Sequence, residues 1–364
     1  MTAPHWSAGV RRRVLSNGLT ILVQHVPAMP AVAVVTRVRA GFFDEPDRWA
    51  GISHVLEHMF FKGTPRRGVG EIARETKNAG GYLNAGTSYD YTVYFTVLPV
   101  NGLATAVDIQ ADALQHALLD GDELRREIVV IIEEAKRKLD TPSAVSQETL
   151  HGLLFDHHRI RRWRIGTETG LRQLTREDLL AYYRSRYVPA STIVSIVGGI
   201  DPDEALTLAE RHYAAWPATP PAVDPSPAEP TARFRRASTL RGDVQQSTLI
   251  LGWRGVPARH QDELALDLAA AVLSAGRASR LYRRLRETGI AASVGAYNYS
   301  PTEVGVFGIS ADIDPRRLGE ACGSVAGLVR GLREEGISNL ELERARTLLL
   351  ARWARRFESA EGRA

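Results

Sequence analysis

Short apolar runs of strand length alternate along the chain with longer segments in which apolar residues recur every three to four positions. The first pattern is typical of strands and the second of amphipathic helices. In the first half, strands are predicted at 13–25 (with a turn at 16–18), 31–38, 82–85, 89–97 and 192–197, and helices at 51–62, 70–78, 102–118, 122–139, 145–155, 176–187 and 203–216. In the second half, strands are predicted at 246–253, 292–298 and 304–311, and helices at 261–274, 277–286, 314–334 and 339–358. Strands thus come mostly in pairs with helices grouped between them, which predicts an α+β fold of two related α/β sandwich domains, each an antiparallel-rich sheet packed with helices.

A proline-rich segment separates the two groups of elements. Residues 217–230 contain six prolines, which exclude a helix and the interior of a sheet. We therefore predict a first domain at 1–216, an extended linker at 217–232 and a second domain of the same kind at 233–364. Two domains are also the default expectation for a chain of 364 residues.

The composition, with 44% hydrophobic and 24% charged residues, is that of a globular protein. It serves mainly to exclude other classes of protein. The formal net charge of +4 comes mostly from arginines dispersed over the chain, without a basic stripe or interleaved aromatic residues, so we expect no nucleic-acid partner. The longest apolar runs are of strand length, so no membrane span is expected. The single cysteine, Cys322, excludes an internal disulfide framework and is expected to be buried in a helix.

The first 13 residues lack the apolar core of a secretory leader, which favours a cytoplasmic location. A periplasmic location stays open for a chain whose start has been trimmed.

The predicted helix at 51–62 carries two histidines and a glutamate in an inverted His-x-x-Glu-His order. His54 and His58 are four residues apart and would lie one turn apart on one face, so both imidazoles can reach a single metal ion. Glu57 would project beside them without having to bind the ion. Zinc would need a third protein ligand, with the fourth position left for water. A histidine pair on a helix is often only a partly buried polar face, so the third ligand decides between the two interpretations.

The predicted helix at 122–139 offers carboxylates for that role. Five consecutive β-branched apolar residues at 128–132 indicate burial on most sides. Because seven residues are close to two turns, Glu127 and Glu134 are expected to share one stripe, whereas Glu133 points about 120° away. Two carboxylates on a buried stripe would cost several kcal/mol each unless they are paired or bound to a metal. They could instead pair with arginines of neighbouring helices, but the histidine motif favours the metal.

Two runs around the motif carry a family resemblance. Residues 40–45 (Ala-Gly-Phe-Phe-Asp-Glu) and 51–64 (Gly-Ile-Ser-His-Val-Leu-Glu-His-Met-Phe-Phe-Lys-Gly-Thr) look like the insulinase/pitrilysin family of zinc metallopeptidases, most closely its processing-peptidase branch. In that family, a helix of the form Glu-x-x-Val-Ile-x-x-Glu follows the motif. Residues 127–134 fit this form, and Glu134 stands 76 positions after His58.

The resemblance implies a zinc-dependent endopeptidase with one zinc ion per chain. It assigns His54, His58 and Glu134 as the zinc ligands and Glu127 as a supporting carboxylate near the histidines. It assigns Glu57 as the general base, which would accept a proton from the zinc-activated water and return it to the leaving amine.

A further segment, at 80–94, reads Gly-Gly-Tyr-Leu-Asn-Ala-Gly-Thr-Ser-Tyr-Asp-Tyr-Thr-Val-Tyr. It is similar to the family's edge-strand segment Gly-Gly-x-x-Asn-Ala-x-Thr-x-x-x-x-Thr-x-Tyr. In the family this strand takes the substrate as an added β-strand, whose backbone hydrogen bonds hold any extended sequence. The resemblance therefore implies extended peptide substrates bound at Asn84 and Ala85. Without the family, Asn84 after a glycine pair is more typical of a turn residue.

The second half departs from the family pattern in two ways. Residues 279–294 are similar to a segment that gives the site an arginine and a tyrosine, but only Arg286 matches, because Ala292 stands at the tyrosine position. A missing hydroxyl removes one stabiliser of the tetrahedral oxyanion. We therefore expect a homodimer, or a heterodimer with a related subunit that supplies the Arg–Tyr pair, since some branch members divide these functions. The second domain, about 132 residues against about 216 in the first, is also expected to be shortened or incomplete.

Two other interpretations stay open at this point. A non-catalytic family member that serves as a structural subunit would generally lose motif residues, and this chain keeps all five. A helical interaction protein with an accidental histidine pair would not carry three concordant segments in the right order.

Overall fold

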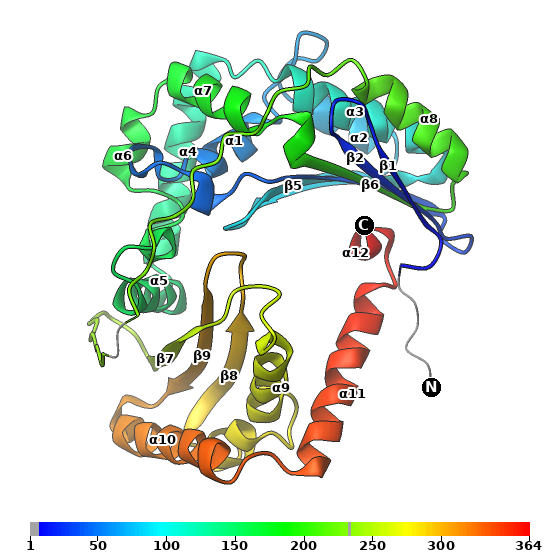
Figure 1. The fold of residues 1–364 in the computed structure, drawn as a ribbon. Helices are drawn as coiled ribbons and strands as arrows, with labels where there is room; N and C mark the ends of the chain where they lie inside the picture. Colours follow the sequence, from blue (N-terminus) through cyan, green and yellow to red (C-terminus); the bar gives the residue numbers. More distant parts are fainter. Residues whose placement is uncertain (1–6, 232–233) are drawn as a thin grey trace. The chain divides into compact units, whose positions relative to one another are not determined.

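The structure is a computed structural model that describes residues 7–231 and 234–364, and the chain forms two compact units (Figure 1). The first unit takes in the chain up to Lys136, then Trp163–Pro225 and Arg356–Ala364. The second unit consists of Arg137–Arg162 and Ser226–Arg355. Part of the first half therefore belongs to the second unit, and the last nine residues belong to the first.

The first unit is built on a six-stranded sheet in the order β1-β2-β6-β3-β5-β4. Every neighbouring pair is antiparallel except β2 and β6, which are parallel. Every second side chain of β5 is buried, as expected of a strand with one face on a core. β4 pairs with β5 alone among the described strands and forms an edge of the sheet. The strands are β1 (Val10–Val14), β2 (Thr20–His25), β3 (Ala31–Val38), β4 (Tyr82–Thr87), β5 (Thr92–Pro99) and β6 (Thr192–Gly198).

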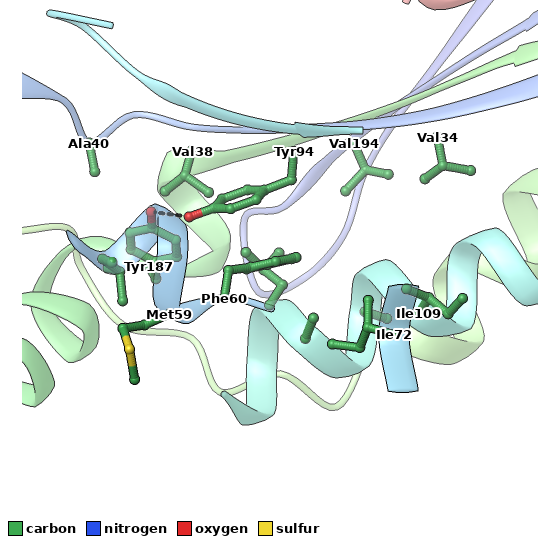
Figure 2. Close-up of a cluster of buried hydrophobic side chains, with 14 of the residues drawn as sticks. Val34, Val38, Ala40, Met59, Phe60, Ile72, Tyr94, Ile109, Tyr187 and Val194 are labelled. Atoms are coloured by element: carbon green, nitrogen blue, oxygen red, sulfur yellow. Dashed lines mark hydrogen bonds between the residues drawn. The ribbon is translucent and has the colours of Figure 1, made fainter. Parts of the chain in front are cut away.

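Helices cover one face of this sheet and enclose the main core (Figure 1). In Figure 2, Tyr94 of β5 reaches from the sheet toward the helices, where its ring stacks on Phe60 at a centroid distance of 3.7 Å. The Tyr94 hydroxyl also shares a 2.8 Å hydrogen bond with that of Tyr187, so the buried polar atoms are satisfied. The helices of this unit on that face are α1 (Ile52–Met59), α2 (Glu71–Asn78), α3 (Leu103–His116), α4 (Gly121–Leu139, which extends into the second unit), α6 (Glu168–Gln173), α7 (Arg176–Arg186) and α8 (Pro202–Tyr213).

The other face of the sheet carries a short segment from the end of the chain. Helix α12 (Ala360–Arg363) packs there, with Ala360 against Ala33 and Val35 of β3. The Tyr82 hydroxyl at the start of β4 donates a 2.9 Å hydrogen bond to Glu361. Neither α6 nor α12 was expected, because each is too short to show a helical period.

The second unit contains a three-stranded antiparallel sheet in the order β7-β9-β8. Its strands are β7 (Ser247–Gly255), β8 (Ala291–Tyr299) and β9 (Gly305–Ile313), and its helices are α5 (Pro142–Leu154), α9 (Glu263–Ser274), α10 (Leu318–Glu334) and α11 (Asn339–Arg356, whose last residue falls in the first unit). The two units together confirm the predicted α+β class, with antiparallel pairing dominant in both sheets. No helix among the described residues has the length and apolarity needed to cross a bilayer.

Two predictions for the second half are wrong. The helix expected at 277–286 is reduced to a π-helical turn at Tyr282–Arg286, because Gly276, in a left-handed conformation, and a turn follow α9. Cys322 on α10 is exposed, since the helix buries only one face, which includes Ala321 and Val325.

The proline-rich segment at 217–231 forms neither helix nor strand. Near its end, the buried carboxylate of Glu229 accepts hydrogen bonds from the backbone N–H groups of Asp156, His157 and His158. The predicted boundary between linker and second domain, at 232 and 233, lies outside the described residues. The division into domains at 1–216 and 233–364 stays a prediction, and the compact units add 137–162 to the second half.

Candidate metal centre

The start of helix α1 depends on Gly51, which precedes the helix, and on the side chain of Glu45. Gly51 precedes the helix with a φ of 96°, and a Cβ there would lie 2.7 Å from the carbonyl oxygen of Ile165. The buried Glu45 accepts hydrogen bonds from the N–H groups of Gly51 at 2.8 Å and Ser53 at 2.9 Å. A carboxylate at a helix N-terminus satisfies donors that the helix leaves open and complements its dipole. These contacts fix the start and direction of the helix that carries the motif.

One face of α1 is buried in the core, and the opposite face presents the motif. His54, Glu57 and His58 are all partly exposed, and the two imidazole rings lie 4.7 Å apart between centroids. The buried face consists of Ile52, Val55, Leu56 and Met59. Burial of this face fixes the orientation of α1, so His54, Glu57 and His58 stay on the side away from the core.

Helix α4 brings Glu134 to the two histidines. Its Oε2 atom lies 3.8 Å from His54 Nε2 and 3.8 Å from His58 Nε2. All three potential ligand atoms lie within 4.8 Å of one another. Two donors that are each about 2.1 Å from one tetrahedral ion would be roughly 3.4 Å apart, so slight side-chain adjustment would let all three bind a single zinc ion. Two imidazoles and one carboxylate are also a ligand set that catalytic zinc uses.

Glu127, two turns before Glu134 on α4, contacts the ring nitrogen of His58 that does not face Glu134. Its Oε2 lies 3.0 Å from His58 Nδ1, and its Oε1 forms an ion pair with Lys62. Burial raises the pKa of Glu127, but the hydrogen bonds from Lys62 and His58 outweigh it and keep the pKa below its usual value. Glu127 is therefore an ionised acceptor that orients the imidazole. Lys62, just beyond the end of α1, was not among the expected site residues.

The expectation that α4 is buried on most sides is wrong. Val129 and Val130 are about half exposed, whereas Ile128, Ile131 and Ile132 are buried, so a single face of α4 packs on the core. Glu127 is buried, but the Glu134 side chain is 41% exposed. A run of β-branched residues does not determine which face of a helix is buried. The expected burial of both carboxylates therefore holds only for Glu127. The exposure of Glu134 leaves the cluster accessible to solvent, as an open catalytic site requires.

The side chain of Glu57 reaches from α1 to strand β4 of the sheet. The hydroxyl of Thr87, at the end of β4, donates a 2.5 Å hydrogen bond to Glu57 Oε2. Burial raises the pKa of Glu57 above its usual value, although the Thr87 hydrogen bond and His58 act in the opposite direction. A carboxylate with a raised pKa is a stronger base once ionised. The matching threonine in the 80–94 segment had no role assigned from sequence.

The edge strand β4 enters the sheet through a glycine pair. A Cβ at Gly81 would lie 1.9 Å from the carbonyl oxygen of Val97, so no larger residue fits there. Asn84 is exposed, and its Oδ1 accepts the N–H of Ala85 at 2.9 Å. Both residues lie on the edge strand that ends at Thr87, next to Glu57. Their substrate-binding role stays a prediction.

Arg286 belongs to the second unit, where it is exposed at the end of the π-helical turn. It lines a cavity of about 600 Å³ together with Ala292, Asp314 and Arg316. Ala292 sits where the β8–β9 register shifts between Ala291 and Ser293. The structure thus brings together His54, Glu57, His58, Glu127 and Glu134 in one unit, and the catalytic role of Arg286 stays a prediction.

The fold and the cluster together place an inverted histidine motif on one helix and a third potential metal ligand on a second helix. Residues 20–168 match the family described as "Insulinase (Peptidase family M16)", and residues 173–349 match "Peptidase M16 inactive domain". The chain belongs to the insulinase family, peptidase family M16, and the family resemblance seen in the sequence is confirmed.

Two relatives are similar in sequence along most of this chain, and a solved structure is similar in fold. An "Uncharacterized zinc protease" of Rickettsia felis is 29% identical over 353 residues, which cover 95% of this chain and 85% of the relative. An uncharacterized zinc protease of Mycobacterium leprae is 30% identical over 343 residues, 92% of this chain and 76% of the relative. The crystal structure of a protease from Helicobacter pylori superposes with a TM-score of 0.91 at 24% identity, over 98% of this chain and 87% of that one, and shows a likeness of fold.

Proposed function

We propose that this chain is a zinc-dependent endopeptidase that cleaves extended peptides. The observation that carries the proposal is the convergence of His54, His58 and Glu134 from two helices, with Glu57 beside them. Zinc, when bound, would supply a Lewis acid and an activated water. The relatives that are named zinc proteases support the same class of activity.

The chain's own residues would perform the remaining steps. Glu57, ionised, takes a proton from the attacking water and delivers it to the leaving amine. Glu127 and His58 keep the ligand ring in a fixed orientation through their 3.0 Å hydrogen bond. The outer edge of β4, which pairs with no other described strand, offers backbone groups to which an extended peptide can add as a strand beside Asn84 and Ala85.

Removal of the metal tests the proposal. Treatment with a chelator should abolish cleavage of an unfolded peptide, and added zinc should restore it, because Glu57 alone cannot deprotonate a water whose pKa zinc has not lowered. His54→Ala should bind less zinc and stay inactive after zinc is added. Full cleavage by the chelated, metal-free chain would contradict the proposal.

The same assay addresses the predicted partner. Ala292 stands where the family carries a tyrosine, which favours a subunit that acts together with a relative bearing the Arg–Tyr pair. The zinc-loaded chain should then cleave weakly alone and strongly when such a relative is added. Robust cleavage by the purified monomer would contradict partner dependence while leaving the zinc peptidase intact. The cytoplasmic location stays a prediction.

Replacement of Thr87 by valine should move the acid limb of the kcat/KM profile to higher pH. The Thr87 hydroxyl lowers the pKa of Glu57, so its loss raises that pKa, and Glu57 is then protonated and inactive as a base up to a higher pH. The pH dependence of peptide cleavage measures this shift. Thr87→Ser keeps the hydroxyl and should retain the wild-type limb; an unshifted limb in Thr87→Val would show that the contact does not tune Glu57.

A further inference from the structure

Lys62 contacts the site without belonging to the ligand cluster. Its Nζ pairs with Oε1 of Glu127, whose other oxygen lies 3.0 Å from His58 Nδ1. The Lys62 side chain is 24% exposed and that of Glu127 only 10%, so water has little access to the carboxylate. Both carboxylate oxygens are thus occupied, one by a cation and one by an imidazole.

The backbone around Lys62 is fixed by local contacts. The Lys62 N–H donates to the carbonyl oxygen of Met59 at 3.1 Å, in a turn that directly follows α1. The next residue, Gly63, has a φ of 108° and its carbonyl oxygen accepts the N–H of Leu118 at 3.0 Å. Lys62 therefore lies just beyond the C-terminal end of α1, where its side chain and that of His58 each contact one oxygen of Glu127.

The contact with Glu127 determines which ring nitrogen of His58 carries the hydrogen. An ionised carboxylate only accepts hydrogen bonds, so the hydrogen of the neutral ring must lie on Nδ1, which faces Glu127. The other nitrogen, Nε2, keeps its lone pair and faces Glu134 at 3.8 Å. The orientation of the Glu127 carboxylate thus decides which nitrogen of His58 is available to a metal ion.

We propose that Lys62 is a positioning residue for the metal centre: it fixes the Glu127 carboxylate so that Glu127 holds His58 in the ring orientation and tautomer that present Nε2 to the ion. This inference rests on the proposed zinc site, and it adds a residue that acts through Glu127 rather than on the ion. Without the ammonium group, a nearly buried carboxylate would lose one partner and could rotate away from His58.

Lys62→Met tests this role because it keeps the length of the side chain and removes the charge. In the metal-free variant at alkaline pH, the ¹⁵N chemical shifts of His58 should show a mixture of tautomers, whereas the wild type shows the hydrogen on Nδ1. Zinc affinity, measured by competition with a chromophoric chelator, should fall by about 10- to 100-fold. Lys62→Arg retains a cation and should recover most of the affinity.

Lys138→Met is the matched control. Lys138 is also 24% exposed and pairs with a buried glutamate, Glu148, at 3.1 Å, but it lies in the second unit. This variant should keep the wild-type zinc affinity and His58 spectrum. Near-ultraviolet circular dichroism checks that each variant is folded.

Lys62→Met that is folded and binds zinc with wild-type affinity, with the hydrogen of His58 still on Nδ1, would overturn the inference. A wild-type chain that binds no zinc would instead overturn the proposed function itself. The tautomer measurement needs no metal, so the two failures are distinguishable.

Discussion

Replacement of Glu57 by glutamine should lower the rate of peptide cleavage by about 10²- to 10⁴-fold, the usual contribution of a general base. Glutamine keeps the size of the side chain and can still meet the Thr87 hydroxyl, but it cannot accept a proton from water. His54, His58 and Glu134 are untouched, so zinc content should stay at the wild-type level. Steady-state cleavage of an unfolded peptide together with metal analysis measures both quantities.

Glu133→Gln is the control for this experiment. Glu133 is an exposed glutamate next to Glu134 on α4 and pairs with Lys136 at 2.8 Å on the helix surface. Its replacement removes one carboxylate near the cluster without touching the predicted machinery, so activity should be unchanged. A Glu57→Gln variant with wild-type activity would exclude Glu57 as the base, whatever the metal content.

Much of the candidate site could be predicted because helical spacing is a local property. The four-residue separation of His54 and His58 and the seven-residue separation of Glu127 and Glu134 determine which side chains share a face. The structure adds that these two faces meet, with Glu134 3.8 Å from both rings. That meeting depends on tertiary packing, which the sequence indicated indirectly, through the histidine motif and the family resemblance.

The features that were missed depend on contacts between distant segments. The exposure of Val130 and Glu134 follows from how α4 packs, and a β-branched run gives no sign of the face it buries. The short helix α12 is stabilised by its contact with β3 rather than by its own four residues. Thr87 acquires its contact with Glu57 only because β4 lies beside α1.

A buried arginine connects the loop that follows α1 to helices α2 and α3. Arg67, whose side chain is 7% exposed, donates hydrogen bonds to Glu75 at 2.9 Å, Asp108 at 2.5 Å and Asp112 at 2.6 Å. Asp112 is almost fully buried and accepts one further hydrogen bond, from Thr64 at 2.7 Å. Because the loop begins at Lys62 and Gly63, this network also holds the segment that follows the metal-binding helix.

Arg67→Met should destabilise the first unit by about 3–5 kcal/mol, since it leaves the buried carboxylate of Asp112 without its cation. The thermal unfolding midpoint of this unit should fall by roughly 6–20 °C. Arg66→Met is the control, because the Arg66 side chain is 58% exposed and pairs with Asp108 on the surface, so its loss should cost about 1 kcal/mol or less. The double variant Arg67→Met/Asp112→Leu should regain part of the lost stability, because an apolar pair needs no compensating charge. A double variant less stable than Arg67→Met alone would show that packing, rather than the unpaired charge, causes the loss.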